Sequence, residues 1–381
     1  MALGTALGPV LGAVREILII AGEASGDMHG AALAEQLRVA APGHALVGLG
    51  GSGMEAAGVQ LLARTAGLIG FVEILGKLPA QLRLLRMVRN RLKSGNVALA
   101  ILIDYGGFNL RAAAAARDAG IPVLYYITPQ VWASRPGRLK GMARVITKAA
   151  VILPFEEELL RANGIDATFV GHPLLDRAVN LPSRAEARRR LGIKDADSVL
   201  ALFPGSRSQE IARHLEDFVE VARDLERRRP GLKVVMGVAP TVDLSGAGIP
   251  YRQIHSASLD ILRAADVALC KSGTTTLEAA IAGCPCAVVY RVNAMTFAVL
   301  KRIVHVRHIG LVNIVAGRGI VPEFVQDDFV PARVADALNP LFDADSSERT
   351  AMTSALAEVA AALGTAGASG RVAKMAAAMV K

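Results

Sequence analysis

Short apolar runs alternate with segments of helical periodicity along most of the chain. Runs of this kind predict strands buried on both faces, and the helical segments between them predict the crossover connections of parallel sheets. We therefore expect an α/β fold. The strands are expected at Glu16–Ile20, Ala45–Leu49, Val97–Ile103, Val123–Ile127, Ala150–Leu153, Thr168–Val170, Val199–Phe203, Lys233–Gly237, Arg252–Ile254, Val267–Cys270 and Ala287–Tyr290.

The pattern breaks near Asn180–Arg184, where Leu-Pro-Ser precedes the charged run Arg184–Arg190. The sequence on each side of this break begins with a strand, a Gly/Ser loop and a helix. Such a repeat predicts two Rossmann-like domains facing a central cleft, with ligands at the carboxyl ends of the strands. The expected domains are residues 1–180 and 181–345, followed by an Ala-rich helical segment at 346–381.

Composition narrows the class of protein. The chain has 381 residues, enough to bury a core without disulfides, and its three cysteines form no CxxC pair, which favours a reducing, cytoplasmic compartment. No apolar stretch reaches the ~18 residues of a spanning helix, and residues 1–14 lack the features of a signal peptide. A net charge of +9 favours anionic partners, whereas 4% aromatic residues give little material for stacking on nucleic acid bases. We expect a soluble protein that does not bind nucleic acid.

The loop after the first strand is the first candidate site. Its glycines allow close backbone approach to a ligand, and a helix is expected afterwards at Ala31–Arg38. An Asp here has a simpler use as a helix cap, but two acids and a His exceed what a cap needs. The polar residues of the loop are Glu23, Ser25, Asp27 and His29.

Asp104 is the second candidate, because it ends the apolar strand of Val97–Ile103. A carboxylate there would face the cleft and could act as the general base for a sugar hydroxyl. The alternative is an Asp that only forms a turn.

Two loops of the second half suit a nucleotide. Backbone amides after Gly205 and Ser206, with the cation of Arg207, suit a phosphate. Small residues at 272–275 precede another helix, and Glu278 could bind ribose hydroxyls. The alternative for Glu278 is a capping box with Thr275. Gly48-Leu-Gly-Gly-Ser-Gly53 fits the dinucleotide pattern GxGxxG, but it does not follow the first strand of its domain, so we do not expect a dinucleotide site.

The segment Lys77–Lys93 carries six basic residues and no acid. Its leucines share one helical face with arginines on the flank, which is typical either of an ordinary amphipathic surface helix or of a helix that contacts anionic lipid headgroups. The expected lipid contacts are Phe71, Ile74, Leu75, Leu78, Leu82, Arg83, Leu85 and Arg86.

Several motifs together resemble the lipid-A-disaccharide synthase family. They are Ala21-Gly-Glu-Ala-Ser-Gly-Asp27, Pro129-Gln-Val-Trp-Ala133, Gly171-His-Pro173, Phe203-Pro-Gly-Ser-Arg207, Lys271-Ser-Gly-Thr-Thr-Thr-Leu-Glu278, Gly310-Leu-Val-Asn-Ile-Val-Ala-Gly-Arg318 and Pro322-Glu-Phe-Val-Gln326. The match runs in order from about Ile17 to Gln326, and the set is far more specific than any one motif.

The resemblance implies an inverting, metal-independent GT-B hexosyltransferase without a cofactor, on the cytoplasmic face of the bacterial inner membrane. UDP-2,3-diacylglucosamine would be its donor, 2,3-diacylglucosamine 1-phosphate its acceptor, and a β(1→6)-linked disaccharide 1-phosphate and UDP its products. Inner-membrane lipids and a second copy of the chain would be further partners. The resemblance assigns Asp104 as candidate base with Glu23 and Asp27 as acids of the first loop. It assigns nucleotide binding to Ser206, Arg207, Ser272, Gly273, Thr274, Glu278, Asn313 and Gln326.

The chain departs from the family pattern at two positions. Gly107 stands where a second carboxylate is expected, and Ser134 stands where an aromatic residue is expected. Two other functions therefore stay open: an epimerase or hydrolase of UDP-sugars with the same fold, and a non-enzymatic UDP- and lipid-binding module.

Overall fold

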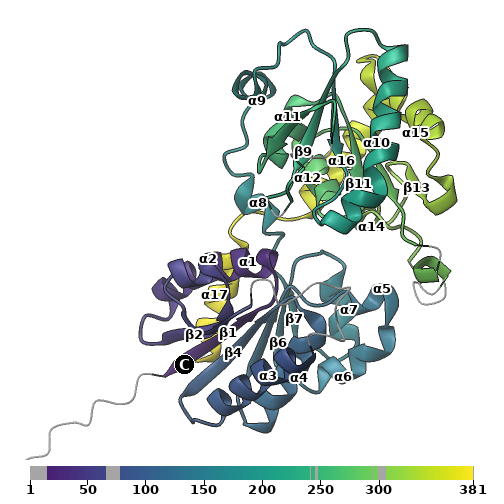
Figure 1. The fold of residues 1–381 in the computed structure, drawn as a ribbon. Helices are drawn as coiled ribbons and strands as arrows, with labels where there is room; N and C mark the ends of the chain where they lie inside the picture. Colours follow the sequence, from purple (N-terminus) through teal and green to yellow (C-terminus); the bar gives the residue numbers. More distant parts are fainter. Residues whose placement is uncertain are drawn as a thin grey trace, which may run out of the picture. The chain divides into compact units, whose positions relative to one another are not determined.

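The computed structural model describes residues 15–65, 78–240, 242–244, 248–293, 295–298 and 306–380. Contacts divide the chain into two compact units (Figure 1). The first unit takes the described residues up to Trp132, Pro136–Pro173 and the residues from Gly367. The second unit takes Ala133–Arg135 and Leu174–Ala366. Phe71, Ile74 and Leu75, which we expect to contact lipid, lie outside the described residues.

The first unit is built on a seven-stranded parallel sheet with the order β3-β2-β1-β4-β5-β6-β7. The predicted strands are present, with small shifts at their ends. The structure adds the edge strand β3, whose residues are only partly buried. The strands are β1 Glu16–Ala21, β2 Ala45–Gly50, β3 Gln60–Arg64, β4 Val97–Ile103, β5 Val123–Tyr126, β6 Lys148–Val151 and β7 Ala167–Phe169.

Helices cover both faces of this sheet, because successive side chains of a strand point to opposite faces. In β1, Leu18 and Ile20 pack into the core under α3 and α4, whereas Ile17 and Ile19 pack into the core under α1 and α17. Each fully buried aliphatic side chain of this kind contributes about 1.5–3 kcal/mol. The helices are α1 Ala24–Ala40, α2 Ser52–Ala56, α3 Leu78–Leu92, α4 Gly106–Asp118, α6 Leu139–Ala143, α7 Glu156–Ala162 and α17 Ala368–Met379, with the short η1 Pro136–Arg138. The short helix α5, Val131–Ser134, is divided between the two units.

The second unit repeats this plan with a six-stranded parallel sheet of order β10-β9-β8-β11-β12-β13. Its strands are β8 Val199–Phe203, β9 Lys233–Val238, β10 Arg252–His255, β11 Val267–Lys271, β12 Cys286–Tyr290 and β13 Glu323–Val325. Its helices include α8 Leu174–Arg177, α9 Arg184–Leu191, α10 Ser208–Arg228, α11 Ser258–Ala264, α12 Thr275–Ala282, α14 Leu311–Ala316, η2 Gln326–Asp328, α15 Pro331–Leu338, η3 Asn339–Phe342 and α16 Ser347–Ala362. Two parallel sheets covered by helices confirm the predicted α/β class.

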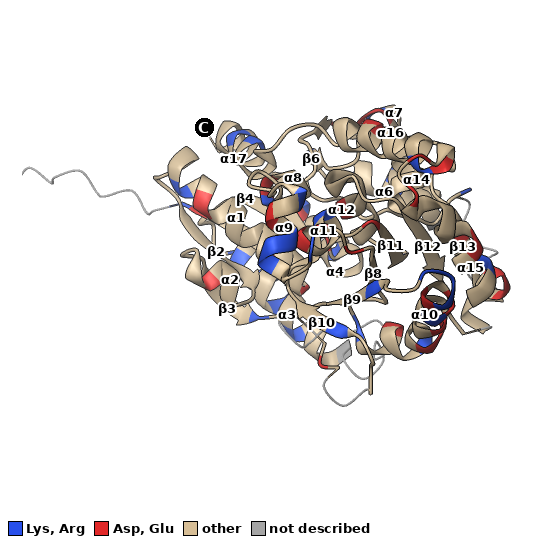
Figure 2. Cartoon of the chain, turned by 90° about the horizontal axis from the view of Figure 1, so that it is seen from above, with Lys and Arg blue, Asp and Glu red and all other residues tan. Residues whose placement is uncertain are grey.

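The charged run after the predicted break is a helix of the second unit, α9, whose basic residues form a blue band in Figure 2. Arg188 is only 2% exposed. Its guanidinium donates to Ala264 O at 2.9 Å and to the Asp266 carboxylate at 3.0 Å, so this charge is paired and hydrogen-bonded in the core as burial requires. The charged run therefore anchors the start of the second unit.

The C-terminal segment does not form a separate part of the molecule. Helix α16 packs on α12 in the second unit, whereas α17 packs on α1 in the first (Figure 1). The apolar face of α17, with Val372, Ala373 and Ala376, joins the first unit's core, and Arg371 Nε donates to Val170 O at 2.8 Å. The segment predicted at 346–381 is thus shared between the two units.

Candidate functional site

The loop after β1 is shorter than predicted, because α1 begins at Ala24 and not at Ala31. Glu23 therefore stands at the N-cap of α1, without a side-chain cap hydrogen bond, and His29 lies inside the helix. Gly22 has a steric reason to be glycine: a Cβ there would lie 2.3 Å from Cγ of Tyr105. The loop is thereby packed directly against the end of β4, next to Asp104.

Asp27 caps a helix, but not the helix predicted. Its Oδ1 accepts from the backbone N–H of Gly51 at 2.7 Å and of Met54 at 3.0 Å, and its Oδ2 accepts from Gly53 at 2.9 Å. These amides are at the start of α2, so Asp27 satisfies donors that the helix itself leaves unpaired. The three bonds account for this carboxylate structurally, and a catalytic role for it stays a prediction.

Asp104 lies directly after β4 in a strained backbone. Asp104 and Tyr105 both have φ of +50°, in the left-handed region that costs non-glycine residues about 1–3 kcal/mol. The strain is held by two side chains, because the Asp104 carbonyl accepts from Asn109 Nδ2 at 2.9 Å and from Tyr125 Oη at 2.7 Å. Asn109 and Tyr125 were not predicted as site residues; the Phe-Asn pair after the glycines was the only sequence signal. The two bonds hold the backbone of Asp104 in this turn at the end of β4.

A buried histidine accompanies this end of the sheet. His172 is 5% exposed, and burial, with a smaller effect of His29, lowers the pKa of His172 to about 4. The imidazole is therefore neutral near pH 7 and can both donate and accept one hydrogen bond. The sequence shows this residue only as part of Gly171-His-Pro173.

In the loop between β8 and α10, a backbone amide and nearby cations contact the carboxylate of Glu210. Ser206 N–H donates to Glu210 Oε2 at 3.1 Å, and Lys271 Nζ lies 2.8 Å from Glu210 Oε1. Arg207 Nη1 lies 3.4 Å from the same oxygen. Burial raises the pKa of Glu210, but the hydrogen bond and charge of Lys271, together with Ser206 N–H and the charge of Arg207, outweigh it, so the pKa lies below its usual value. Lys271 and Glu210 were both missed, although Lys271 begins one of the quoted motifs and Glu210 lies three residues after another.

The loop between β11 and α12 does not form the capping box considered for Thr275 and Glu278. Thr274 stands at the N-cap with no side-chain cap bond. Glu278 is 5% exposed, and its Oε1 accepts from Arg177 Nη1 at 3.1 Å and from Ser258 Oγ at 3.0 Å. Burial raises the pKa of Glu278, and Arg177 opposes the rise.

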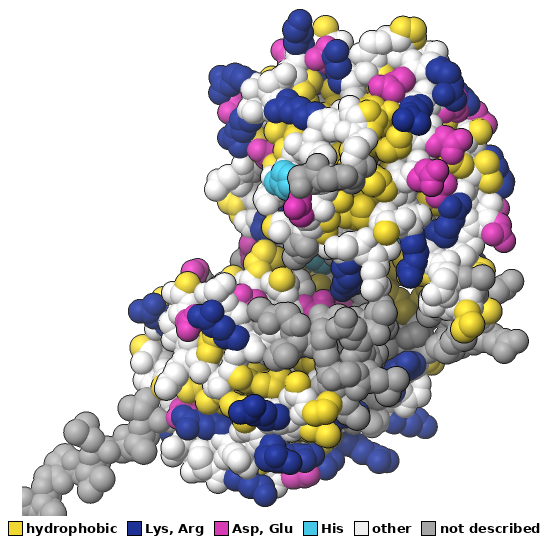
Figure 3. Space-filling view, in the orientation of Figure 1, with side chains coloured by type: hydrophobic (Ala, Val, Ile, Leu, Met, Phe, Trp, Pro, Cys, Tyr) yellow, Lys and Arg dark blue, Asp and Glu magenta, His cyan; other side chains and the backbone are white. Residues whose placement is uncertain are grey.

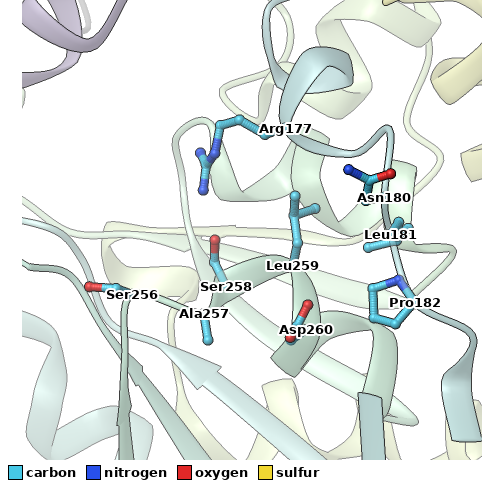
Figure 4. A pocket seen from close by; sticks show the side chains of 9 residues that line it. All are labelled: Arg177, Asn180, Leu181, Pro182, Ser256, Ala257, Ser258, Leu259 and Asp260. Carbon is cyan, nitrogen blue, oxygen red and sulfur yellow. The ribbon is translucent and has the colours of Figure 1, made fainter. Parts of the chain in front are cut away.

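Arg177 and Ser258 also line a pocket of about 210 Å³ within the second unit. Figure 4 shows the Arg177 guanidinium and the Ser258 hydroxyl pointing toward one another. Ser256, at the pocket edge, has φ of +57°, one of several positive-φ positions that directly follow a strand. The pocket walls are Arg177, Asn180, Leu181, Pro182 and Ser256–Asp260. A polar hollow beside a buried carboxylate suits a small hydroxyl-rich ligand.

Three further predicted binding residues use their polar atoms inside the unit. Asn313 donates to Glu323 Oε1 at 2.8 Å and accepts from Ile320 N–H at 2.8 Å, which holds the approach to β13. The Gln326 side chain makes two hydrogen bonds to the backbone of Val292: it accepts from the N–H at 2.6 Å and donates to the carbonyl at 3.0 Å. Ser272 Oγ donates to Ile309 O at 2.7 Å. These contacts give all three residues a structural role, and their contact with a nucleotide stays a prediction.

The structure corrects one predicted lipid contact. Leu85 on α3 is 4% exposed and belongs to the first unit's core, so it cannot face a lipid surface. Leu82 is 50% exposed, and Arg83 and Arg86 are exposed beside it. Figure 3 shows Lys and Arg side chains close to hydrophobic ones on the part of the first unit where Figure 1 draws α3. Nothing is described of the Leu78 side chain.

The chain matches a known family over most of its length. Residues 17–369 match the model described as lipid-A-disaccharide synthetase. The chain belongs to this family. A lipid-A-disaccharide synthase of Syntrophotalea carbinolica is 39% identical over 371 residues, which cover 95% of this chain and 94% of the relative. A lipid-A-disaccharide synthase of Anaeromyxobacter sp. (strain K) is 40% identical over 371 residues, which cover 94% of this chain and 96% of the relative. The resemblance drawn from the motifs is confirmed.

Solved structures show the same fold at low identity. The glycotransferase of kitacinnamycin superposes with a TM-score of 0.63 at 16% identity, covering 96% of this chain and all of that one. A putative UDP-N-acetylglucosamine 2-epimerase from Listeria monocytogenes superposes with a TM-score of 0.60 at 12% identity, covering 90% of this chain and 91% of that one. The family member described here thus has two Rossmann-like domains of the GT-B type. Among its described residues, none of the helices has the length and apolar character needed to cross a membrane.

Proposed function

We propose that the chain joins UDP-2,3-diacylglucosamine to 2,3-diacylglucosamine 1-phosphate and releases UDP. The observation that carries the proposal is Asp104, the family's candidate base, held in a strained turn by Asn109 and Tyr125 at the end of β4. Strain of this kind persists where the surrounding structure over-determines it, and it clusters at active sites. Membership of the family supplies the substrates.

In the proposed reaction Asp104 accepts the proton of the acceptor's 6-hydroxyl. The oxygen attacks the anomeric carbon of the donor in line, the bond from that carbon to the UDP oxygen breaks, and the electron pair leaves with UDP. One displacement converts the α-linked donor into a β(1→6) product. General bases of this kind contribute about 10²–10⁴-fold to the rate.

The second unit would bind the nucleotide. Backbone amides at Ser206 and near Gly273 and Thr274, with the cation of Arg207, would stabilise the negative charge on departing UDP. Glu278 would accept from the ribose hydroxyls, and Arg177 with Ser258 would fix the direction of that carboxylate. The pocket beside them supports this assignment, because polar side chains line a hollow next to the buried acid.

Both substrates carry acyl chains, so the enzyme would work at a membrane surface. We propose that the exposed Leu82, Arg83 and Arg86 of α3 contact the cytoplasmic face of the inner membrane, since arginines beside exposed leucine suit anionic headgroups.

The test is an assay in detergent micelles with each substrate omitted in turn and EDTA present, with products identified by mass. We expect a disaccharide 1-phosphate only when both substrates are supplied. UDP release without the acceptor would contradict the proposal and indicate a hydrolase.

Asp104→Asn should reduce transfer at least 100-fold with UDP binding intact, because it removes only the base. Asp118→Asn is the matched control, as Asp118 is exposed at the other end of the helix that follows Asp104 and pairs with Arg117. Equal activity of Asp104→Asn and the control would refute the assignment of the base.

A further inference from the structure

Three charged side chains meet where β8 and β11 end in the second unit. Lys271 ends β11, and Glu210 lies in the first turn of α10. The Lys271 ammonium lies 2.8 Å from Glu210 Oε1, and the two side chains are 15% and 16% exposed. The Tyr290 ring lies under the same ammonium, 5.5 Å from its centroid. This ion pair is shielded from solvent far more than the other contact of Glu210, with Arg207, which is 56% exposed.

The donors around Glu210 are those that bind a phosphate group. Its carboxylate receives one backbone N–H, one ammonium and one guanidinium, from Ser206, Lys271 and Arg207. The backbone has been brought close to it, because a Cβ on Gly205 would lie 2.9 Å from Cβ and 3.0 Å from Oε2 of Glu210. An internal anion thus occupies a cradle of amide and cationic donors.

The described contacts of the Glu210 carboxylate include more positive than negative charge. His214 lies on the same helix. Its Nε2 accepts a hydrogen bond from the backbone N–H of Arg291 at 2.9 Å, and its Nδ1–H donates to the backbone carbonyl of Glu210 at 2.6 Å. Each ring nitrogen then has a fixed role, and the imidazole is neutral. Among the described contacts of the Glu210 carboxylate, one negative charge therefore faces the two positive charges of Lys271 and Arg207.

We propose that Glu210 is an internal counter-anion of the donor's phosphate site, which holds Lys271 and Arg207 until the diphosphate of the nucleotide displaces it. The inference rests on the proposed function, and it adds Lys271 to the groups that bind the diphosphate. A diphosphate offers more oxygens and more charge than one carboxylate, so it can take over the same donors. The carboxylate keeps the cations in position without a ligand, and it weakens diphosphate binding because it competes for them. Its return would assist UDP release.

The test measures binding of inorganic pyrophosphate, UDP and uridine by calorimetry to the full chain. Glu210→Gln removes the competing charge with little change of shape, and it should tighten binding of pyrophosphate and UDP about tenfold while leaving uridine unchanged. Glu216→Gln is the matched control, because Glu216 is exposed farther along α10. Lys271→Met should weaken pyrophosphate binding at least tenfold, and it provides a second measurement if Glu210→Gln does not fold.

The outcomes separate this inference from the proposed function. If Glu210→Gln binds pyrophosphate no more tightly than Glu216→Gln does, or if Lys271→Met binds it normally, the counter-anion is refuted, even where UDP binds and is released as proposed. If pyrophosphate binding tightens but neither protein binds UDP, the anion site stands and the nucleotide of the proposed function is wrong.

Discussion

At the scale of single residues, the most unusual carboxylate outside the proposed site is Glu156. It is 2% exposed, accepts from the indole Nε1–H of Trp132 at 3.0 Å and from Leu153 N–H at 3.2 Å, and lies next to Phe155, whose ring contacts the indole edge-on. Burial raises the pKa of Glu156 to about 7, although its hydrogen bonds with Trp132 and backbone amides oppose the rise.

Folding stability should therefore depend on this carboxyl group. In the unfolded chain it ionises near pH 4.5 and in the folded chain near pH 7, so between these values the native state binds one proton more and stability falls as pH rises. The loss is complete above pH 7 and amounts to about 3 kcal/mol at 1.36 kcal/mol per pKa unit. Glu156→Gln should lack this step.

Urea unfolding of both proteins from pH 4.5 to 8 measures the step, and the chain's single tryptophan reports it directly. A difference in unfolding free energy between the two proteins that stays constant across this range would contradict the assignment.

At the scale of helices and strands, the continuous apolar runs predicted the central strands because those strands are buried on both faces. The strands β3 and β13 were missed; both lie at sheet edges, where their residues are at most partly buried, and β13 has only three residues. The start of α1 was misplaced because its glycines resemble a loop. They serve packing instead: a Cβ on Gly30 would lie 2.6 Å from Sδ of Met54, a contact that no sequence pattern reveals.

The space around Gly107, which stands where the family has an acid, predicts how its replacement changes the stability of the fold. Gly107 lies in the first turn of this helix, and a Cβ there meets no atom within 4 Å. Gly107→Asp should stabilise the fold by about 1 kcal/mol, because it removes a helical glycine and places an anion near the helix N-terminus. Its neighbour provides the contrast: a Cβ on Gly106 would lie 2.7 Å from Cβ of Pro129, so Gly106→Asp should destabilise. Thermal unfolding that ranks these two variants in the opposite order would exclude this packing.

At the scale of the whole molecule, the motifs predicted the family, which is confirmed, and Asp104 as candidate base, which stays a prediction; they did not predict the hydrogen bonds to its backbone carbonyl. Asn109 and Tyr125 reach the Asp104 carbonyl only because the helix α4 and the strand β5 are brought beside β4 by folding. The division of the chain was equally hidden. The Ala-rich pattern of residues 346–381 predicts helices, yet nothing in it distinguishes α16, in the second unit, from α17, in the first.

If α17 is part of the first unit's core, a cavity in it must destabilise that unit. Val372 on α17 is fully buried against the core shared with α1, whereas Val39 on α1 itself is 81% exposed. Val372→Ala should lower the free energy of unfolding by about 2 kcal/mol, and Val39→Ala should change it by less than about 0.5 kcal/mol. Trp132 belongs to the first unit, so its fluorescence during urea unfolding follows the unit concerned even where the two units unfold separately. Equal urea midpoints for the two variants would mean that α17 does not stabilise the first unit. Residues 346–381 would then be a separate segment, as the sequence pattern predicts.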